Sequence, residues 1–403
     1  MPEETTVESK SIPKVEDGAP PEPGTPVRSL RELIDRVTGR GFKTPDSVEP
    51  AGLAEAVPFP FLALVGQREM KLALLLALIN PAIGGVLLIG PRGTGKTTAV
   101  RSLVDLLPSV LRSLCYYGCL PEDVESGGID AICPDCARKY AQGEPLARMA
   151  NGRLVELPLN ARLDDVIGRI DERPEINIRM RLQRGLLSQA DRNILYVDEV
   201  NLLDGEIVDA LLDAAAQGSY TVRRGAHSAT YWSRFIFIGS MNPEEGKLRP
   251  QIQDRFGLRI LVHGLNDPAE RLEAYRRVQA YSMNPRRVAL DYAMETEYAR
   301  SEIQSARELL SQVMIPDKVA YFGLEITNRL HIDSLRAEIT LFEAARAYAA
   351  ADARSTVSVE DLRIVSPLAL RLRRSGFMQD YFTNQMVEEN ELGNVLTELF
   401  ETS

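Results

Sequence analysis

The sequence predicts a three-layer α/β domain built on a parallel sheet, followed by an all-helical domain. Three observations lead to this prediction. Runs of aliphatic and β-branched residues without polar alternation occur at residues 85–89, 193–197 and 234–238, a pattern typical of strands that are covered on both faces. Helical patterns separate these runs, as in a parallel α/β unit. After about residue 265 the strand pattern ends, and the remaining segments have helical periodicity.

In chain order, the first 46 residues are acidic and proline-rich, which predicts a disordered tail, with one short amphipathic helix at 28–37. The α/β core is expected at 47–265, with helices at 67–79 and at 96–107, the latter ended by Pro108. A helical lid is expected at 266–375, with helices at 267–281, 298–313, 334–353 and 359–374. The acidic tail, 376–403, contains one weak helical pattern at 387–400.

Composition excludes several classes of protein. A net charge of -10 argues against a protein whose main role is to coat nucleic acid. The longest aliphatic run, residues 72–79, is too short to span a bilayer, and the acidic N-terminus lacks the apolar region of a secretory signal. Four cysteines in 403 residues are too few for a disulfide scaffold. We therefore expect a soluble cytoplasmic protein.

A phosphate-binding loop follows the first predicted strand. The segment fits the pattern G-x4-G-K-[ST] and opens a helix, so its backbone N–H groups and the helix N-terminus would face an anion. Lys96 would reach the β and γ phosphates of a nucleotide, and the Thr97 hydroxyl would bind Mg²⁺. A glycine-rich turn without a ligand is the alternative, but the flanking strand and helix make it a weak one. The residues expected to contact ATP here are Gly90, Pro91, Arg92, Gly93, Thr94, Gly95, Lys96, Thr97 and Thr98.

An Asp-Glu pair ends the second predicted strand, at Asp198 and Glu199. Asp198 would complete the Mg²⁺ site, and Glu199 would polarise the attacking water, because hydrolysis needs a group that activates water. The alternative is a pair of acids at a helix start, where the helix dipole favours them. The nearby phosphate loop favours the catalytic interpretation.

Two further polar residues are candidates for the same site. Asn242 ends the third predicted strand and could hydrogen-bond the γ-phosphate or the water, although an Asn before Pro243 is also common in turns. Arg255 is a candidate arginine finger, which would supply positive charge to the transition state. A single Arg in a helix is more often a solvated surface residue.

All four cysteines of the chain lie in one insert, at 112–140. Their spacing is C-x3-C-x13-C-x2-C, at Cys115, Cys119, Cys133 and Cys136. Two close pairs of this kind are typical of a four-thiolate zinc site that stabilises a segment with little core. A redox pair at Cys133 and Cys136, or four unligated thiols, are the alternatives.

Taken together and in this order, these segments resemble the AAA+ ATPases and, more narrowly, the I-subunit family of magnesium chelatases. The resemblance extends over about 59–374 and is carried by residues 65–67, 70–74, 90–108, 155–161, 165–168, 185–187, 196–203 and 242–246. It implies that Asn242 is the residue called sensor 1 and that Arg255 is the finger. It also implies that Arg336, in the Leu-Arg-Ala-Glu step at 335–338, is sensor 2.

The resemblance implies an assembly as well as a fold. The expected assembly is a homo-hexameric ring with ATP sites between subunits, in the cytoplasm or a stromal-type compartment. Its expected partners are a second AAA+ subunit with a von Willebrand-like domain and a large porphyrin-binding subunit, and its reaction is ATP-dependent Mg²⁺ insertion into protoporphyrin IX. The alternative is a chelatase-like, MoxR-type ATPase that remodels another metalloprotein. A nucleic-acid motor is disfavoured by the net charge and by the lack of a basic, aromatic stripe.

Overall fold

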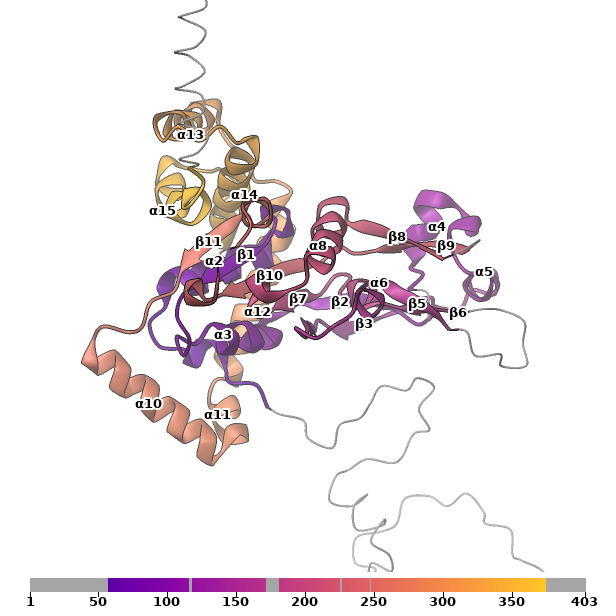
Figure 1. The fold of residues 1–403 in the computed structure, drawn as a ribbon, viewed down its shortest axis with the longest axis horizontal. Helices are drawn as coiled ribbons and strands as arrows, with labels where there is room; N and C mark the ends of the chain where they lie inside the picture. Colours follow the sequence, from indigo (N-terminus) through magenta and orange to yellow (C-terminus); the bar gives the residue numbers. More distant parts are fainter. Residues whose placement is uncertain (1–56, 116–117, 172–180, 225–226, 247, 375–403) are drawn as a thin grey trace, which may run out of the picture. The chain divides into compact units, whose positions relative to one another are not determined.

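The computed structural model describes residues 57–115, 118–171, 181–224, 227–246 and 248–374. The tails predicted at 1–46 and 376–403, with the helices predicted at 28–37 and 387–400, lie outside the described residues. Within the described part, the chain forms a sheet with helices on both faces, a helical region and three two-stranded ribbons (Figure 1).

A five-stranded sheet forms the centre of the α/β domain. Its strand order is β11-β1-β10-β7-β4, and every pair is parallel, as the sequence predicts. The three predicted runs are confirmed as β1, β7 and β10, although β10 begins two residues later than expected and extends further. The two outer strands, β4 and β11, have no counterpart in the prediction. The strand bounds are β1 Val86–Ile89, β4 Leu154–Leu157, β7 Ile194–Val197, β10 Ile236–Met241 and β11 Leu258–Leu261.

Alternate residues of the strands enter two different hydrophobic cores. Leu88 and Ile238 pack on one face with α2 (Arg68–Ile79) and α3 (Lys96–Ser102). Leu87 and Phe237 pack on the other face with α6 (Leu163–Ile167), α7 (Leu186–Gln189), α8 (Gly205–Gln217) and α9 (Pro250–Arg255). Because both faces are covered, the strands contain continuous apolar runs instead of alternating ones. The predicted three-layer arrangement is confirmed.

The helix predicted at 96–107 is shorter than expected. α3 ends at Ser102 and continues as a 3-10 turn, Leu103–Leu106. Pro108 disfavours helical backbone at the residue before it, and Leu107 is indeed extended, with φ -66° and ψ 127°. The end of the helix therefore tightens into a 3-10 turn ahead of the proline.

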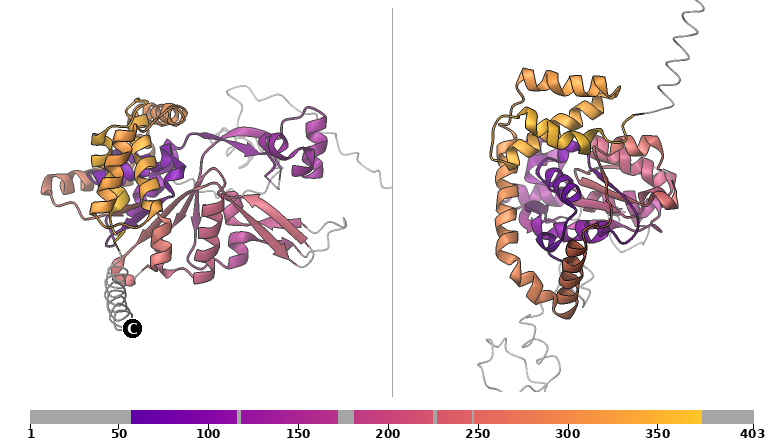
Figure 2. Two further views of the ribbon diagram at one scale, coloured as in Figure 1. Left: turned by 90° about the horizontal axis from the view of Figure 1, so that it is seen from above. Right: turned by 90° about the vertical axis from the view of Figure 1, so that its left-hand side faces the viewer.

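The C-terminal part of the described chain is helical. Its helices are α10 Pro268–Met283, α11 Pro285–Asp291, α12 Ala293–Leu310, α13 Asp317–Arg329, α14 Leu335–Ala351 and α15 Val359–Leu370. α12 runs along the sheet domain (Figure 2), where Arg300 donates to the Asp105 carbonyl and Arg307 to the Leu78 carbonyl at 2.6 Å. The last strand ends at Leu261, and only helices follow it in the described chain. Because α12 packs against the core of the sheet domain, the domain limits of 47–265 and 266–375 stay a prediction.

Three antiparallel ribbons extend from the core. β2 (Ser109–Ser113) pairs with β3 (Ala147–Asn151), β5 (Gly168–Asp171) with β6 (Arg181–Arg184), and β8 (Ser219–Arg224) with β9 (His227–Trp232). The first ribbon carries the cysteine insert, which folds into α4 (Pro121–Gly127), a 3-10 turn at Ile129–Ala131 and α5 (Pro134–Ala141). Among the helices that the structure describes, none has both the length and the apolar character needed to cross a membrane.

Candidate functional site

The phosphate-binding loop lies between β1 and α3, as the sequence predicts. Gly95 caps α3 with φ +85°, a backbone conformation that favours glycine. Close packing requires glycine at position 90. A Cβ there would lie 2.1 Å from the carbonyl oxygen of Val262, the residue that follows β11. The Gly90 amide also donates to the Met241 carbonyl at 3.1 Å, which ties the loop to the neighbouring strand β10.

Lys96 lies inside this loop. Its Nζ donates to the carbonyl oxygens of Gly90 at 2.7 Å and of Pro91 at 2.8 Å. Burial lowers the pKa of Lys96, while the negative charge of Asp198 acts in the opposite direction. The loop therefore holds an ammonium group among backbone amides, which is the arrangement that binds a polyphosphate chain.

Asp198 follows β7 and meets α3 across the sheet edge. Its Oδ2 accepts from the Thr97 hydroxyl at 3.0 Å, and its Oδ1 accepts from the Tyr196 hydroxyl at 2.9 Å and from the Ser240 hydroxyl. Burial alone would raise the pKa of Asp198, but the hydrogen bonds from these three hydroxyls outweigh burial and lower it. The two predicted Mg²⁺ ligands, Thr97 and Asp198, are thus in direct contact.

Sequence reasoning missed the roles of Tyr196 and Ser240 in holding this carboxylate. The signal was present, because side chains two residues apart on a strand point to the same face. Tyr196 lies two residues before Asp198, and Ser240 lies two residues before Asn242, which was itself predicted to reach the site.

Glu199 has an unusual backbone conformation, with φ +53° and ψ 51°. Its amide donates to the Ser240 hydroxyl at 3.1 Å, and Arg92 lies 3.6 Å from its carboxylate. Burial and the negative charge of Glu245 raise the pKa of Glu199. A carboxylate with a raised pKa beside the phosphate loop can accept a proton from water more readily than an ordinary one.

Asn242 follows β10 and is nearly buried. Its Nδ2 donates to Glu245 Oε1 at 3.0 Å, and its Oδ1 accepts from the Glu244 amide at 3.2 Å. A cavity of about 210 Å³ brings Asn242 together with the phosphate loop and the acid pair. The cavity is lined by Arg92, Gly93, Thr94, Gly95, Lys96, Thr97, Thr98, Asp198, Glu199, Ser240, Met241 and Asn242.

A second cavity, of about 480 Å³, shares Gly93, Thr94, Gly95 and Thr98 with the first. Its other walls are largely apolar and come from the segment before α2 and from α10; they include Phe59, Leu64, Val65, Leu265 and Val278. An apolar cavity that continues from a phosphate site can hold the base of a nucleotide. The sequence alone gave no indication of this cavity, because its walls come from segments about 200 residues apart.

Arg255 and Arg336 are not among the residues that line these two cavities. Arg336 instead donates to the Asp254 carboxylate at 3.1 Å, where the nearly buried Arg373 also donates, at 3.0 Å, and Arg259 forms an ion pair at 3.5 Å. Arg255, the next residue, is half-buried at the end of α9. Arg336 is thus held by the residue that precedes Arg255, and neither predicted arginine is on the wall of the phosphate cavity of its own chain.

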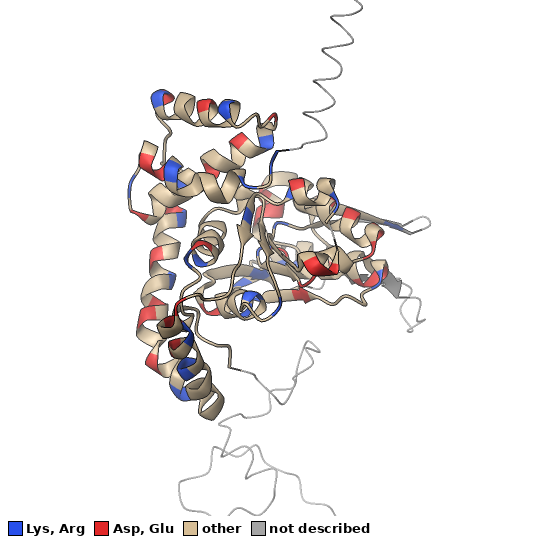
Figure 3. Cartoon of the chain, turned by 60° about the vertical axis from the view of Figure 1, so that its left-hand side comes forward, with Lys and Arg blue, Asp and Glu red and all other residues tan. Residues whose placement is uncertain are grey.

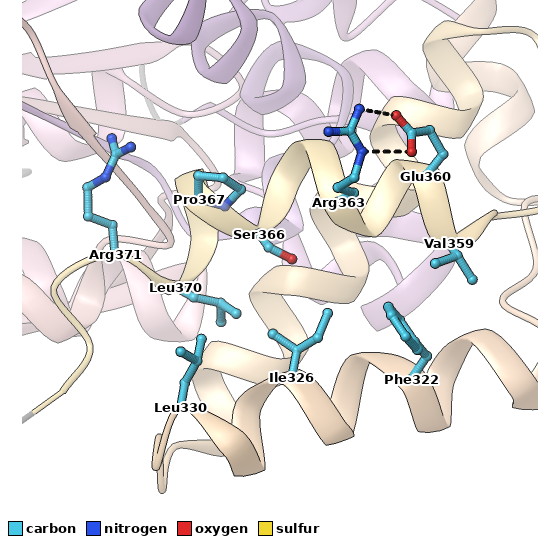
Figure 4. Close-up of a pocket in the computed structure, with 10 residues that line it drawn as sticks. All are labelled: Phe322, Ile326, Leu330, Val359, Glu360, Arg363, Ser366, Pro367, Leu370 and Arg371. Atoms are coloured by element: carbon cyan, nitrogen blue, oxygen red, sulfur yellow. Dashed lines mark hydrogen bonds and ion pairs between the residues drawn. The ribbon is translucent and has the colours of Figure 1, made fainter.

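A third cavity lies in the helical region, between α13 and α15 (Figure 4). Its volume is about 580 Å³, and its apolar walls include Phe322, Ile326, Val359 and Leu370. The close-up shows the Glu360–Arg363 ion pair at its margin. This cavity shares no residue with the phosphate site, and its apolar walls do not fit a triphosphate.

The four cysteines converge in the insert, away from the residues of the phosphate site. Their sulfur atoms all lie within 4.8 Å of one another, and none is in a disulfide.

These features define an AAA ATPase. The parallel sheet is covered on both faces, the phosphate loop after β1 faces the acid pair after β7, and a helical region follows the sheet. The family described as the AAA domain matches residues 84–224, and the AAA lid domain matches residues 324–392. A solved structure from Cytophaga hutchinsonii shares the fold, with 19% identity and a TM-score of 0.52 over 82% of this chain and 90% of that one.

Known relatives narrow the assignment. The magnesium-chelatase subunit ChlI homolog of Methanocaldococcus jannaschii is 42% identical over 335 residues, 82% of this chain and 90% of the relative. The chloroplastic magnesium-chelatase subunit ChlI of Glycine max is 43% identical over 318 residues, 78% of this chain and 74% of the relative. The chain belongs to the family of magnesium-chelatase ChlI subunits.

Proposed function

We propose that this chain is the ATP-hydrolysing motor subunit of a magnesium chelatase, which inserts Mg²⁺ into protoporphyrin IX during (bacterio)chlorophyll synthesis. The observation that carries the proposal is the identity of 42% to 43% with chelatase subunits over most of the chain. It is supported by the cavity that brings the phosphate loop, the acid pair and Asn242 together.

The residues around the phosphate loop fit MgATP. The backbone amides of the loop and the Lys96 ammonium would bind the phosphates and neutralise their charge. The Thr97 hydroxyl and the Asp198 carboxylate, which already touch, would hold Mg²⁺. Tyr196 and Ser240 would keep the carboxylate ionised and correctly oriented.

Glu199 and Asn242 would act on the attacking water. Glu199 would accept a proton from the water or orient it, and its raised pKa suits this task. Asn242 would position the water or the γ-phosphate, for which its Nδ2 would have to leave Glu245. These roles are supported by the position of both side chains on the wall of the phosphate cavity.

Arg255 would act as the finger on the nucleotide of a neighbouring subunit, and Arg336 would serve as sensor 2. Neither lines the phosphate cavity of its own chain, and Arg255 is half-buried at the end of α9, so it is not fully enclosed within its own subunit, as a finger acting on a neighbour requires. The resemblance to the AAA+ family suggests six copies in a closed ring, and a ring is one of the two forms, the other being a filament, that a head-to-tail contact between subunits can produce.

The family suggests the partners and the compartment. We expect a second AAA+ subunit with a von Willebrand-like domain, a large subunit that binds the porphyrin, and a soluble setting in the cytoplasm or the chloroplast stroma. Nucleic acid is not an expected partner, since the net charge is -10 and basic and acidic residues are interspersed over the described ribbon (Figure 3).

The test is reconstitution. The purified chain, the two partner subunits, MgATP and protoporphyrin IX should together yield magnesium protoporphyrin, measured by its fluorescence, and Glu199→Gln should abolish the product. If the chain hydrolyses ATP but a complete partner set gives no magnesium protoporphyrin, the motor proposal is wrong. The second candidate, a MoxR-type ATPase that remodels another metalloprotein, would then be favoured.

A further inference from the structure

The cysteine insert has too small an apolar core to be stable by burial alone. The buried cluster consists of Cys119, Ile132 and Cys136 of the insert and of Leu146 just after it, so two of its four members are cysteines. A segment of this size normally needs a disulfide or a metal ion to fold. Since the described cysteines are all free thiols, a disulfide does not supply this stability.

The four thiols are arranged as metal ligands. Tetrahedral zinc has Zn–S distances of about 2.3 Å, which places the four sulfur atoms roughly 3.8 Å apart. The sulfur atoms of the insert, all within 4.8 Å of one another, approach this arrangement closely. The ligands come from two turns, Cys115 with Cys119 and Cys133 with Cys136, and Cys136 is fully buried.

Backbone and hydroxyl donors point at the sulfur atoms. The Cys119 amide donates to Cys115 Sγ at 3.3 Å, and the Ser113 hydroxyl donates to the same atom at 3.5 Å. The Cys133 amide donates to Cys119 Sγ at 3.2 Å. Donors of this kind orient metal-bound thiolates and compensate their negative charge.

The insert is docked onto the ATPase core through α4. Asp123 accepts from the indole Nε1 of Trp232 at 2.7 Å, and Glu122 forms an ion pair with Arg192, the residue just ahead of β7. The Arg234 guanidinium lies 4.4 Å from the centre of the Trp232 ring and is paired with Asp191 at 3.2 Å. The cysteine cluster thus lies in the same insert as α4. Through Glu122, α4 contacts Arg192 ahead of β7, the strand that Asp198 follows.

We propose that Cys115, Cys119, Cys133 and Cys136 bind one Zn²⁺ in a closed, structural site that folds the insert and thereby docks α4 on Trp232 and Arg192. With four thiolates the coordination sphere is filled, so the metal activates no water and takes no part in ATP hydrolysis. The proposal does not depend on the identity of the chelatase substrate.

The first experiment is elemental analysis of the full chain purified without added metal. About one zinc per chain is expected, with thiols that react with a thiol reagent only after the metal is removed. Cys136→Ser should lose the zinc, whereas Asp135→Asn, an exposed neighbour in the same turn, should keep it. Nucleotide binding at Lys96 should survive in both variants, which separates loss of the metal from global unfolding.

The second experiment uses Trp232, the single tryptophan of the chain, as a reporter of docking. Removal of zinc from the wild-type protein should shift the tryptophan emission to longer wavelength, and re-addition of zinc should reverse the shift. Asp123→Ala should give the same shift while retaining its zinc, because it removes the acceptor of the indole N–H and the acceptor of the Leu120 amide at the start of α4, but no metal ligand.

Three results would overturn the proposal. Zinc far below one per chain, with freely reactive thiols or a reversible Cys133–Cys136 disulfide, would favour redox chemistry. Iron in place of zinc, with the visible absorption of iron–sulfur coordination, would refute the choice of metal. Stoichiometric zinc whose removal leaves the Trp232 emission unchanged would refute the docking role.

Discussion

Replacement of Asp254 by asparagine should destabilise the protein strongly, because one carboxylate compensates three arginines. Arg373 and Arg259 are 1% and 2% exposed, and Asp254 is the acid within ion-pair distance of both. The third partner, Arg336, is 44% exposed. The Asp254→Asn variant would keep the shape of the side chain but leave two buried guanidinium groups without a counter-charge.

The magnitude follows from these contacts. A charge-assisted hydrogen bond to a buried group, here the one from Arg373, contributes roughly 1.5–3 kcal/mol. The longer Arg259 pair adds about 1 kcal/mol, and the exposed Arg336 pair adds less than that. Both buried arginines keep backbone carbonyl acceptors, at Leu372 and at Gly257, and Asp254 itself is 45% exposed. We therefore expect a loss of about 2–3 kcal/mol, at or below the lower limit of the roughly 3–5 kcal/mol that a fully buried pair costs when it is broken.

The assay is thermal denaturation followed by circular dichroism. At about 2.1 cal/mol/K of unfolding entropy per residue, a loss of this size in a folded part of roughly 300 residues should lower the midpoint by about 3–5 °C. The matched control is Glu360→Gln, which breaks the exposed Glu360–Arg363 pair and should leave the midpoint close to that of the wild type, because solvent screens this pair. Adding Arg373→Met to Asp254→Asn should recover part of the loss, because it removes one uncompensated charge. An Asp254→Asn midpoint equal to that of Glu360→Gln would refute the electrostatic argument.

Three predictions concern catalysis. Lys96→Ala should weaken ATP binding roughly 10- to 100-fold, whereas Glu199→Gln should bind ATP normally and lose turnover roughly 100- to 10,000-fold; wild-type turnover in Glu199→Gln would refute its role. Mixing inactive Arg255→Ala with inactive Lys96→Ala subunits should restore part of the ATPase, and no recovery in demonstrably mixed assemblies would argue against a finger acting in trans. Glu245→Gln removes a charge that raises the pKa of Glu199, so the acidic limb of kcat/KM should move to lower pH; an unchanged limb, or a shift to higher pH, would contradict the assignment.

The sequence predicts the central strands well because they are covered on both faces and read as unbroken apolar runs. β11 was not predicted because Arg259 interrupts its run of apolar residues. Only the tertiary structure shows that this arginine is buried and paired with Asp254. β4 is similarly interrupted by Glu156, which pairs with Arg101 of α3 on the exposed side. A charged residue in a strand looks like a surface residue when its partner is distant in sequence.

The site residues that lie in one continuous sequence motif could be predicted. Contacts between residues far apart in the sequence could not where no motif indicates them, because only the folded chain brings such residues together. The phosphate loop is recognised from its spacing alone, and the contact between Thr97 and Asp198 follows from placing a helix start beside a strand end. By contrast, nothing local indicates that Arg336 contacts Asp254, because 82 residues separate them. The same holds for the apolar cavity next to the loop.

The left-handed backbone conformation of Glu199 makes the loss of this side chain by mutation favourable for stability. A side chain costs about 1 kcal/mol in this conformation relative to glycine, and the residue proposed to act on water is therefore a liability to the fold. A duplicated gene copy released from the need to hydrolyse ATP would gain stability by replacing this glutamate with glycine or asparagine. With glycine or asparagine at this position, the phosphate loop would still bind ATP, and the site would lack the carboxylate proposed to act on water.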